Sequence, residues 1–171
     1  ELTARYGLPV TPHERLKPVA WQEAPSGELI VDFGQNIAGA VDFTVRGHEG
    51  QTITIRHAEA LERGELYVQN LRSAKQTLTY ICKEGRQSCS PRFTYMGFRY
   101  IGISGVRRED IESIEAVAVY SDFRTIGSFS CSNDDLNQLQ RNLTWSGKDN
   151  FVDIPTDCPQ RDERQGWTGD I

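Results

Sequence analysis

Apolar and polar residues alternate with a period of two along the chain from about residue 28 to residue 130. Val41, Phe43 and Val45 are separated by polar residues, and β-branched or aromatic residues dominate the other runs. This period places side chains alternately on the two faces of an extended strand, which is typical of half-buried β-strands. Turns that contain glycine separate the runs, with almost no helical period between them. The pattern predicts an antiparallel β-sandwich over residues 28–130.

Two segments do not share this pattern. Residues 1–27 carry four prolines and no clear period, which is typical of an extended connector or of the tail of a preceding domain. The long link from His57 to Lys75 is expected to cross between the two sheets of the sandwich.

The character of the sequence changes near residue 131. Ser132 begins a capping box, in which side chains satisfy the free amide groups at the start of a helix. Three leucines then follow at helical spacing, and the helix is predicted to end at Gly147. These leucines are Leu136, Leu139 and Leu143. One such helix buries little apolar surface, and the chain stops at Ile171 directly after a dense polar stretch. We therefore expect residues 131–171 to be the truncated start of a second, helical domain.

Charge and composition argue against several classes of protein. The formal net charge is −5 at pH 7 and the basic residues are scattered, so nucleic acid is not an expected partner. No apolar stretch approaches the ~18 residues of a membrane span.

The spacing of the four cysteines and three histidines does not match a metal site. We expect free thiols, with a Cys82–Cys89 bridge as the alternative. Free thiols favour a cytoplasmic location, with secretion as the alternative.

Residues 153–170 concentrate groups that carry chemistry. They include five carboxylates, two arginines and a tryptophan, and two prolines and two glycines shape the backbone. Carboxylates and arginines can bind sugar hydroxyl groups, while an aromatic ring packs against the apolar face of a sugar. Glycosidic cleavage needs one protonated carboxyl as acid and one ionised carboxylate as base or nucleophile. Spacing alone does not choose the acid, and a structural turn held by ion pairs is the alternative.

Several motifs in this chain resemble those of bacterial α-L-rhamnosidases. The most specific motif is DCPQRDERxGWTGD over residues 157–170, where the family usually has Leu at the position of Gln165. Weaker matches lie at residues 32–39, 56–59, 70–75, 91–100 and 127–132. The resemblance implies an inverting glycoside hydrolase in which a β-sandwich precedes an (α/α)6-barrel catalytic domain. This chain would hold the sandwich, the first helix and the active-site loop of the barrel.

The resemblance also implies a role for each residue of the main motif. Glu163 matches the general acid, which protonates the leaving oxygen. The matches to sugar-binding positions are Asp157, Arg161 and Asp170 for the rhamnose hydroxyl groups and Trp167 for the wall of the site. The general base of the family is another Glu, far downstream and beyond the end of this chain. We therefore expect the chain alone to be inactive and no cofactor to be required.

The expected function is hydrolysis of terminal α-L-rhamnosyl groups by a longer parent protein. Its partners would be a rhamnose-containing glycoside and the remainder of the catalytic domain. One alternative is a non-catalytic β-sandwich that binds carbohydrate or docks a neighbouring domain. Another is a different glycosidase on the same helical barrel. Within the motif, Asp162 and Arg164 are expected to be structural and Cys158 to be a packed thiol. Trp167 as an ordinary core residue also stays open.

Overall fold

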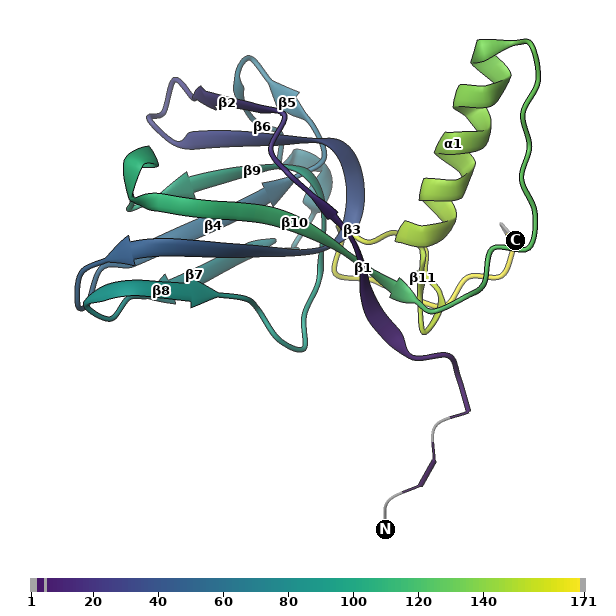
Figure 1. The fold of residues 1–171 in the computed structure, drawn as a ribbon, viewed down its shortest axis with the longest axis horizontal. Helices are drawn as coiled ribbons and strands as arrows, with labels where there is room; N and C mark the ends of the chain where they lie inside the picture. Colours follow the sequence, from purple (N-terminus) through teal and green to yellow (C-terminus); the bar gives the residue numbers. More distant parts are fainter. Residues whose placement is uncertain (1–2, 5, 170–171) are drawn as a thin grey trace.

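One long strand links the two layers of a β-sandwich in the computed structural model, which describes residues 3–4 and 6–169 (Figure 1). This strand is β3 (Leu29–Gly47). Its antiparallel partners are β2 (Ala20–Glu23) and β9 (Met96–Ser104) along its first half, and β10 (Ile111–Ser121) and β8 (Gly85–Cys89) along its second half. The predicted antiparallel sandwich is confirmed.

The bend that lets β3 join both layers lies at a bulge. The register between β3 and β9 shifts between Asp32 and Ile37. Gly34 lies in this bulge with a φ of 77°, a conformation that favours glycine. The backbone amide of Gly34 donates to the Asp32 carboxylate at 2.6 Å. A bulge of this kind bends the strand and redirects its side chains.

The remaining strands extend the two layers outward. In the first layer, β9 pairs with β4 (Thr52–Ala58), which pairs with β7 (Thr77–Ile81). In the second layer, β10 pairs with β1 (Val10–Leu16) at the edge of the sheet. Residues 10–16 and 20–23, which the sequence assigned to a connector, therefore form β1 and β2. Pro12 is tolerated in β1 because an edge strand can leave a ladder position without an amide donor.

The link between His57 and Lys75 stays beside one layer. It contains the short strands β5 (Leu61–Glu62) and β6 (Glu65–Leu66), which pair with each other, and the 3-10 helix η1 (Gln69–Leu71). The strands on either side of it, β4 and β7, pair directly. The prediction that this link crosses between sheets is wrong, because it returns to the neighbouring strand.

Apolar side chains from both layers meet in the core. Phe98, Ile53 and Val41 are fully buried, and burial of each such side chain contributes about 1.5–3 kcal/mol. His57 is also fully buried among them, and burial lowers its pKa to about 4. Its Nδ1 lies 2.9 Å from the backbone oxygen of Gln76. The four cysteines are free, which confirms the prediction of thiols.

The helix α1 (Asp134–Asp149) stands beside one end of the sandwich (Figure 1). The Asn133 side chain caps it by accepting from the amides of Asp135 and Leu136, so the predicted cap at Ser132 is one residue early. The predicted end at Gly147 is wrong, because Gly147 lies inside the last turn. After α1 come the short strands β11 (Phe151–Val152) and β12 (Ile154–Pro155).

The three leucines of α1 lie on its outer surface. The exposed fractions are 47% for Leu136, 52% for Leu139 and 59% for Leu143. The opposite face of the helix meets the sandwich, where Trp145 packs against the core and Asp149 is buried. Among the described residues, no helix combines the length and apolar character that a membrane crossing needs.

Gly147→Ala is expected to stabilise the last turn of α1 by about 0.5–1 kcal/mol. A Cβ atom at this position meets no atom within 4 Å and the φ angle is not positive, so alanine loses no contact and restricts the unfolded chain. Slower hydrogen exchange of amides in the last turn would show this. Faster exchange would instead place Gly147 at the end of the helix, as the sequence suggested.

Candidate active site

The polar segment after α1 folds into a loop that is closed at its base. Thr156 and Gly166 form an isolated β-bridge. Just inside it, the amide of Asp157 donates to the carbonyl of Gln165 at 3.2 Å. The amide of Gln165 donates in return to the Asp157 carboxylate at 3.1 Å. We call residues 157–165 the acid loop.

Arg161 gathers the carboxylates of the acid loop. Its guanidinium lies 3.6 Å from the carboxylate of Asp157 and 3.9 Å from that of Glu163. Its Nε donates to the sulfur of Cys158 at 3.0 Å, which is a buried free thiol as expected. The structure therefore brings together three of the predicted site residues, Asp157, Arg161 and Glu163. Asp170 lies outside the described residues.

Trp167 lies just beyond the acid loop and is 54% exposed in this chain. Its backbone amide donates to the carbonyl of Pro155 at 3.1 Å. Its side chain lines a cavity of about 390 Å³ together with Asp157, Thr156 and the end of α1. An aromatic residue and an acidic residue thus line the same cavity, a combination that is suited to binding a sugar.

The segment that follows η1 holds the acid loop from the sandwich side. Arg72 forms an ion pair with Glu163. The Ser73 hydroxyl donates to the Asp162 carboxylate at 2.6 Å, and this bond lowers the pKa of Asp162. Further along, the side-chain amide of Gln76 donates to the backbone carbonyl of Gln160 at 2.6 Å. Asp162 is therefore a structural anchor that accepts a hydrogen bond from a serine.

Two residues of this segment have an unfavourable backbone conformation. Arg72 has a φ of 57° with a ψ of −116°, and Gln76 has a φ of 45°. A residue held in such a region costs about 1–3 kcal/mol and persists only where its surroundings fix it. Both residues reach the acid loop through their side chains, so the strain lies where the sandwich meets the loop.

Strand β9 and the residue before it form the other support of the acid loop. An added Cβ atom at Gly97 would lie 2.6 Å from the backbone nitrogen of Gln160 and 2.8 Å from the carbonyl carbon of Pro159. Only glycine allows this close approach. Beside it, the Arg164 guanidinium lies 4.0 Å from the ring centroid of Tyr95 and donates to the Tyr95 carbonyl at 2.6 Å. Arg164 is therefore structural, as predicted.

A second cavity, of about 380 Å³, lies where the bulge of β3, α1 and the acid loop meet. Two carboxylates in its wall were not predicted. Glu59 accepts from the Asn36 side chain at 2.9 Å, and Asp149 accepts from the backbone amide of Ala38 at 2.8 Å. Burial raises the pKa of both, that of Asp149 to about 7. Glu59 lies in one of the weaker motifs, whereas no sequence signal marked Asp149.

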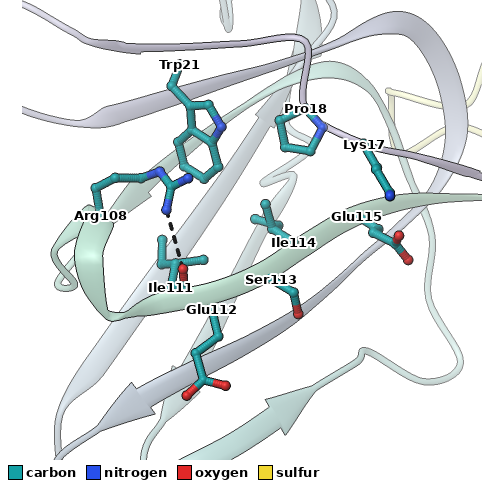
Figure 2. A pocket seen from close by; sticks show the side chains of 9 residues that line it. All are labelled: Lys17, Pro18, Trp21, Arg108, Ile111, Glu112, Ser113, Ile114 and Glu115. Atoms are coloured by element: carbon teal, nitrogen blue, oxygen red, sulfur yellow. Dashed lines mark hydrogen bonds between the residues drawn. The ribbon is translucent and has the colours of Figure 1, made fainter.

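A third cavity, of about 330 Å³, lies on the sandwich and tests the alternative of a sugar-binding module. Figure 2 shows Trp21 and Arg108 at its upper edge. The Arg108 guanidinium lies 3.9 Å from the centroid of the Trp21 ring, and Trp21 also packs against the core. The ring face under Arg108 is therefore occupied and does not offer a stacking platform. Within the part of the chain that the structure describes, no cluster of three or more His, Cys, Asp or Glu could hold a metal ion.

Two family models match the chain. The concanavalin-like domain of bacterial α-L-rhamnosidases matches residues 22–120. The six-hairpin glycosidase domain of the same enzymes matches residues 124–171, which include α1 and the acid loop.

Individual relatives agree with these matches. An α-L-rhamnosidase from Alteromonas sp. (strain LOR) is 40% identical over 95% of this chain and 18% of its own length, and one from Formosa agariphila is 47% identical over 82% and 16%. The α-L-rhamnosidase of Streptomyces avermitilis complexed with L-rhamnose superimposes with a TM-score of 0.93 at 38% identity, over 99% of this chain and 17% of that one. The native α-L-rhamnosidase from Aspergillus terreus superimposes with a TM-score of 0.91 at 43% sequence identity, over 96% of this chain and 20% of that one. The chain thus spans less than a fifth of the curated relatives.

Gly97→Ala is expected to loosen the acid loop, because the new Cβ atom displaces the backbone at Gln160. A local cost of about 1–3 kcal/mol would raise the alkylation rate of the buried Cys158 by about fivefold or more. Mass spectrometry of iodoacetamide-treated protein measures this rate, and the exposed Cys131 is the internal reference. Gly127→Ala, where a Cβ atom meets nothing within 4 Å, is the matched control. An unchanged rate in Gly97→Ala would contradict the packing described here.

Asp149→Asn should change the pH dependence of stability. The folded-state pKa of Asp149 is raised to about 7 from an ordinary value of 3.8, so the folded protein holds a proton that the unfolded chain releases. The wild-type free energy of unfolding therefore falls from about pH 4 to about pH 7 and then levels. The free energy of unfolding of the asparagine variant does not fall in this way, so the variant becomes more stable relative to wild type over the same pH range. Urea denaturation at pH 5 and pH 8 measures the difference, and an equal difference at both values would refute the assignment.

Proposed function

The chain belongs to the bacterial α-L-rhamnosidase family, and we propose that the protein containing it hydrolyses terminal α-L-rhamnosyl groups of glycosides or polysaccharides. The observation that carries this proposal is the cluster of Asp157, Arg161 and Glu163 in one anchored loop beside an exposed tryptophan. The relatives are named α-L-rhamnosidases, and one solved relative is complexed with L-rhamnose. The reaction is a glycoside hydrolysis that needs two carboxyl groups.

Glu163 is the general acid in this proposal. Its carboxyl gives a proton to the glycosidic oxygen as the bond to the sugar carbon breaks, and the aglycone leaves as a neutral alcohol. A second carboxylate takes a proton from water, which attacks the opposite face of the sugar and inverts its configuration. The side chain of Glu163 keeps about a third of its surface exposed, so a leaving group can reach it.

The neighbouring residues bind the sugar. The hydroxyl groups of rhamnose are held by Asp157 and Arg161, and also by Asp170. Asp157 is suited to this role because the Gln165 amide and Arg161 fix its carboxylate. The ring of Trp167 packs against the apolar face of the sugar. No cofactor is needed for acid and base catalysis of this kind.

The 171-residue chain is inactive alone in this proposal, because the general base is supplied by sequence outside it. The remainder of the catalytic domain is also the partner that covers the leucine face of α1. The exposed side chains of Leu136, Leu139 and Leu143 support such a partner. The free cysteines support a cytoplasmic location.

Glu163→Gln in the full-length protein is expected to lower kcat on alkyl rhamnosides by about 10²–10⁴-fold, because the amide cannot donate the catalytic proton. Rhamnose binding should persist. Glu112→Gln is the matched control, because Glu112 is likewise paired with two arginines but lies on the sandwich, away from the acid loop. The isolated chain, assayed alongside, should give no turnover.

Three outcomes of this experiment would contradict the proposal. Unchanged turnover in Glu163→Gln would exclude Glu163 as the acid. Turnover of other aryl glycosides but not of rhamnosides would exclude the sugar. Sugar affinity without any turnover, mapping to the sheet, would favour the non-catalytic binding module.

A further inference from the structure

Arg72 combines a strained backbone with a contact to the proposed general acid. It follows directly after η1 with a φ of 57° and a ψ of −116°, where glycine would be favoured over arginine. Its side chain leaves the sandwich and pairs with the Glu163 carboxylate. The site therefore has an arginine where the backbone alone favours glycine, which indicates that the side chain has a use.

The residues on either side of Arg72 are held in place. Leu71, the residue before it, is buried, and the Leu71 carbonyl accepts from the amide of Ala74 at 3.0 Å. The residue after it, Ser73, donates to Asp162, the neighbour of Glu163 in the acid loop. Arg72 thus projects from a segment held at both ends, and its guanidinium has a defined place relative to the loop.

Two guanidinium groups lie beside Glu163, and they differ in their other contacts. Arg161 is shared, because it also lies near Asp157 and donates to Cys158. Its distance to the Glu163 carboxylate is 3.9 Å, which is an ion pair but too long for a direct hydrogen bond. Arg72 donates a hydrogen bond directly to the other oxygen of that carboxylate. Of these two arginines, Arg72 is therefore the one that can orient the Glu163 carboxyl directly.

We propose that Arg72, supplied by the β-sandwich, is a positioning residue for the general acid Glu163. The inference rests on the proposed function. The guanidinium fixes the orientation of the carboxyl toward the leaving oxygen. It also stabilises the negative charge that develops on Glu163 as its proton moves to that oxygen. The sandwich thereby contributes a residue to catalysis rather than only a support for the barrel.

The test uses three variants of the full-length protein, namely Arg72→Gly, Arg72→Lys and the control Arg63→Gly. Arg63 is an exposed arginine in the turn between β5 and β6 with a φ of 52°, so its replacement relieves a similarly positive φ angle away from the acid loop. Each protein is assayed for thermal stability and for kcat/KM across pH. The substrates are a methyl rhamnoside and a nitrophenyl rhamnoside, which have poor and good leaving groups.

Arg72→Gly should keep or raise the melting temperature and lower kcat/KM on the methyl rhamnoside by about tenfold or more, within the range of general acid catalysis. The loss should be smaller on the nitrophenyl rhamnoside, which needs less help from an acid. Loss of a positive charge beside a carboxyl favours its protonated form, so the alkaline limb of the pH profile should move to higher pH. Arg72→Lys keeps the positive charge, so the alkaline limb of its pH profile should stay at the wild-type pH. Its kcat/KM on the methyl rhamnoside should fall in part, because lysine lacks the planar guanidinium.

Equal losses on both substrates with an unmoved pH profile would overturn the proposal and leave Arg72 a structural residue. Activity equal to that of Arg63→Gly would overturn it as well. If Arg72→Gly does not fold, Arg72→Lys is the variant that tests the proposal. Full activity of Arg72→Lys on the methyl rhamnoside would overturn it. A folded wild-type protein without rhamnosidase activity would instead overturn the proposed function on which this inference rests.

Discussion

The pairing of Asp32 with Arg99 at the bulge of β3 is the interaction on which the site depends. Both carboxylate oxygens accept from the guanidinium at 2.8 Å, and one also accepts from the bulge amide of Gly34. The arginine lowers the pKa of Asp32 and so favours its charged form. It locks β3 against β9 at the point where the register shifts. Because β9 also presents Gly97 to the acid loop, this register sets where the loop lies.

The acid loop is held mainly by single polar contacts rather than by a large apolar interface. Side chains of the sandwich donate to Asp162 and to the carbonyl of Gln160, and Arg164 returns a bond to the carbonyl of Tyr95. Each bond of this kind contributes only about 0.5–1.5 kcal/mol but fixes a direction. Such an arrangement suits a catalytic loop, in which orientation matters more than stability.

The sequence predicted the parts of this structure that follow from local patterns. Alternation identified the sandwich because each strand buries one face, and a specific motif marked the residues of the acid loop. Residues 10–23 were missed because prolines hide edge strands from a pattern based on alternation. The helix cap was placed one residue early because Ser132 and Asn133 are both good caps, and Gly147 does not reveal whether it ends a turn or lies within it. Arg72 lies in one of the weaker motifs, but its pairing with Glu163 joins segments distant in sequence. The contact of Asp149 with Ala38 does the same, and no motif marked Asp149.

The close approach of Gly97 to the backbone of the acid loop has a consequence for how such proteins can be recombined. Two family models meet between residues 120 and 124, which invites exchange of one module for another at that point. Yet the two sides of this junction share a surface on which a single methyl group does not fit. A chimera joined there inherits a loop shaped for a different neighbour. Grafts should therefore carry the sandwich together with the first helix and the acid loop as one piece.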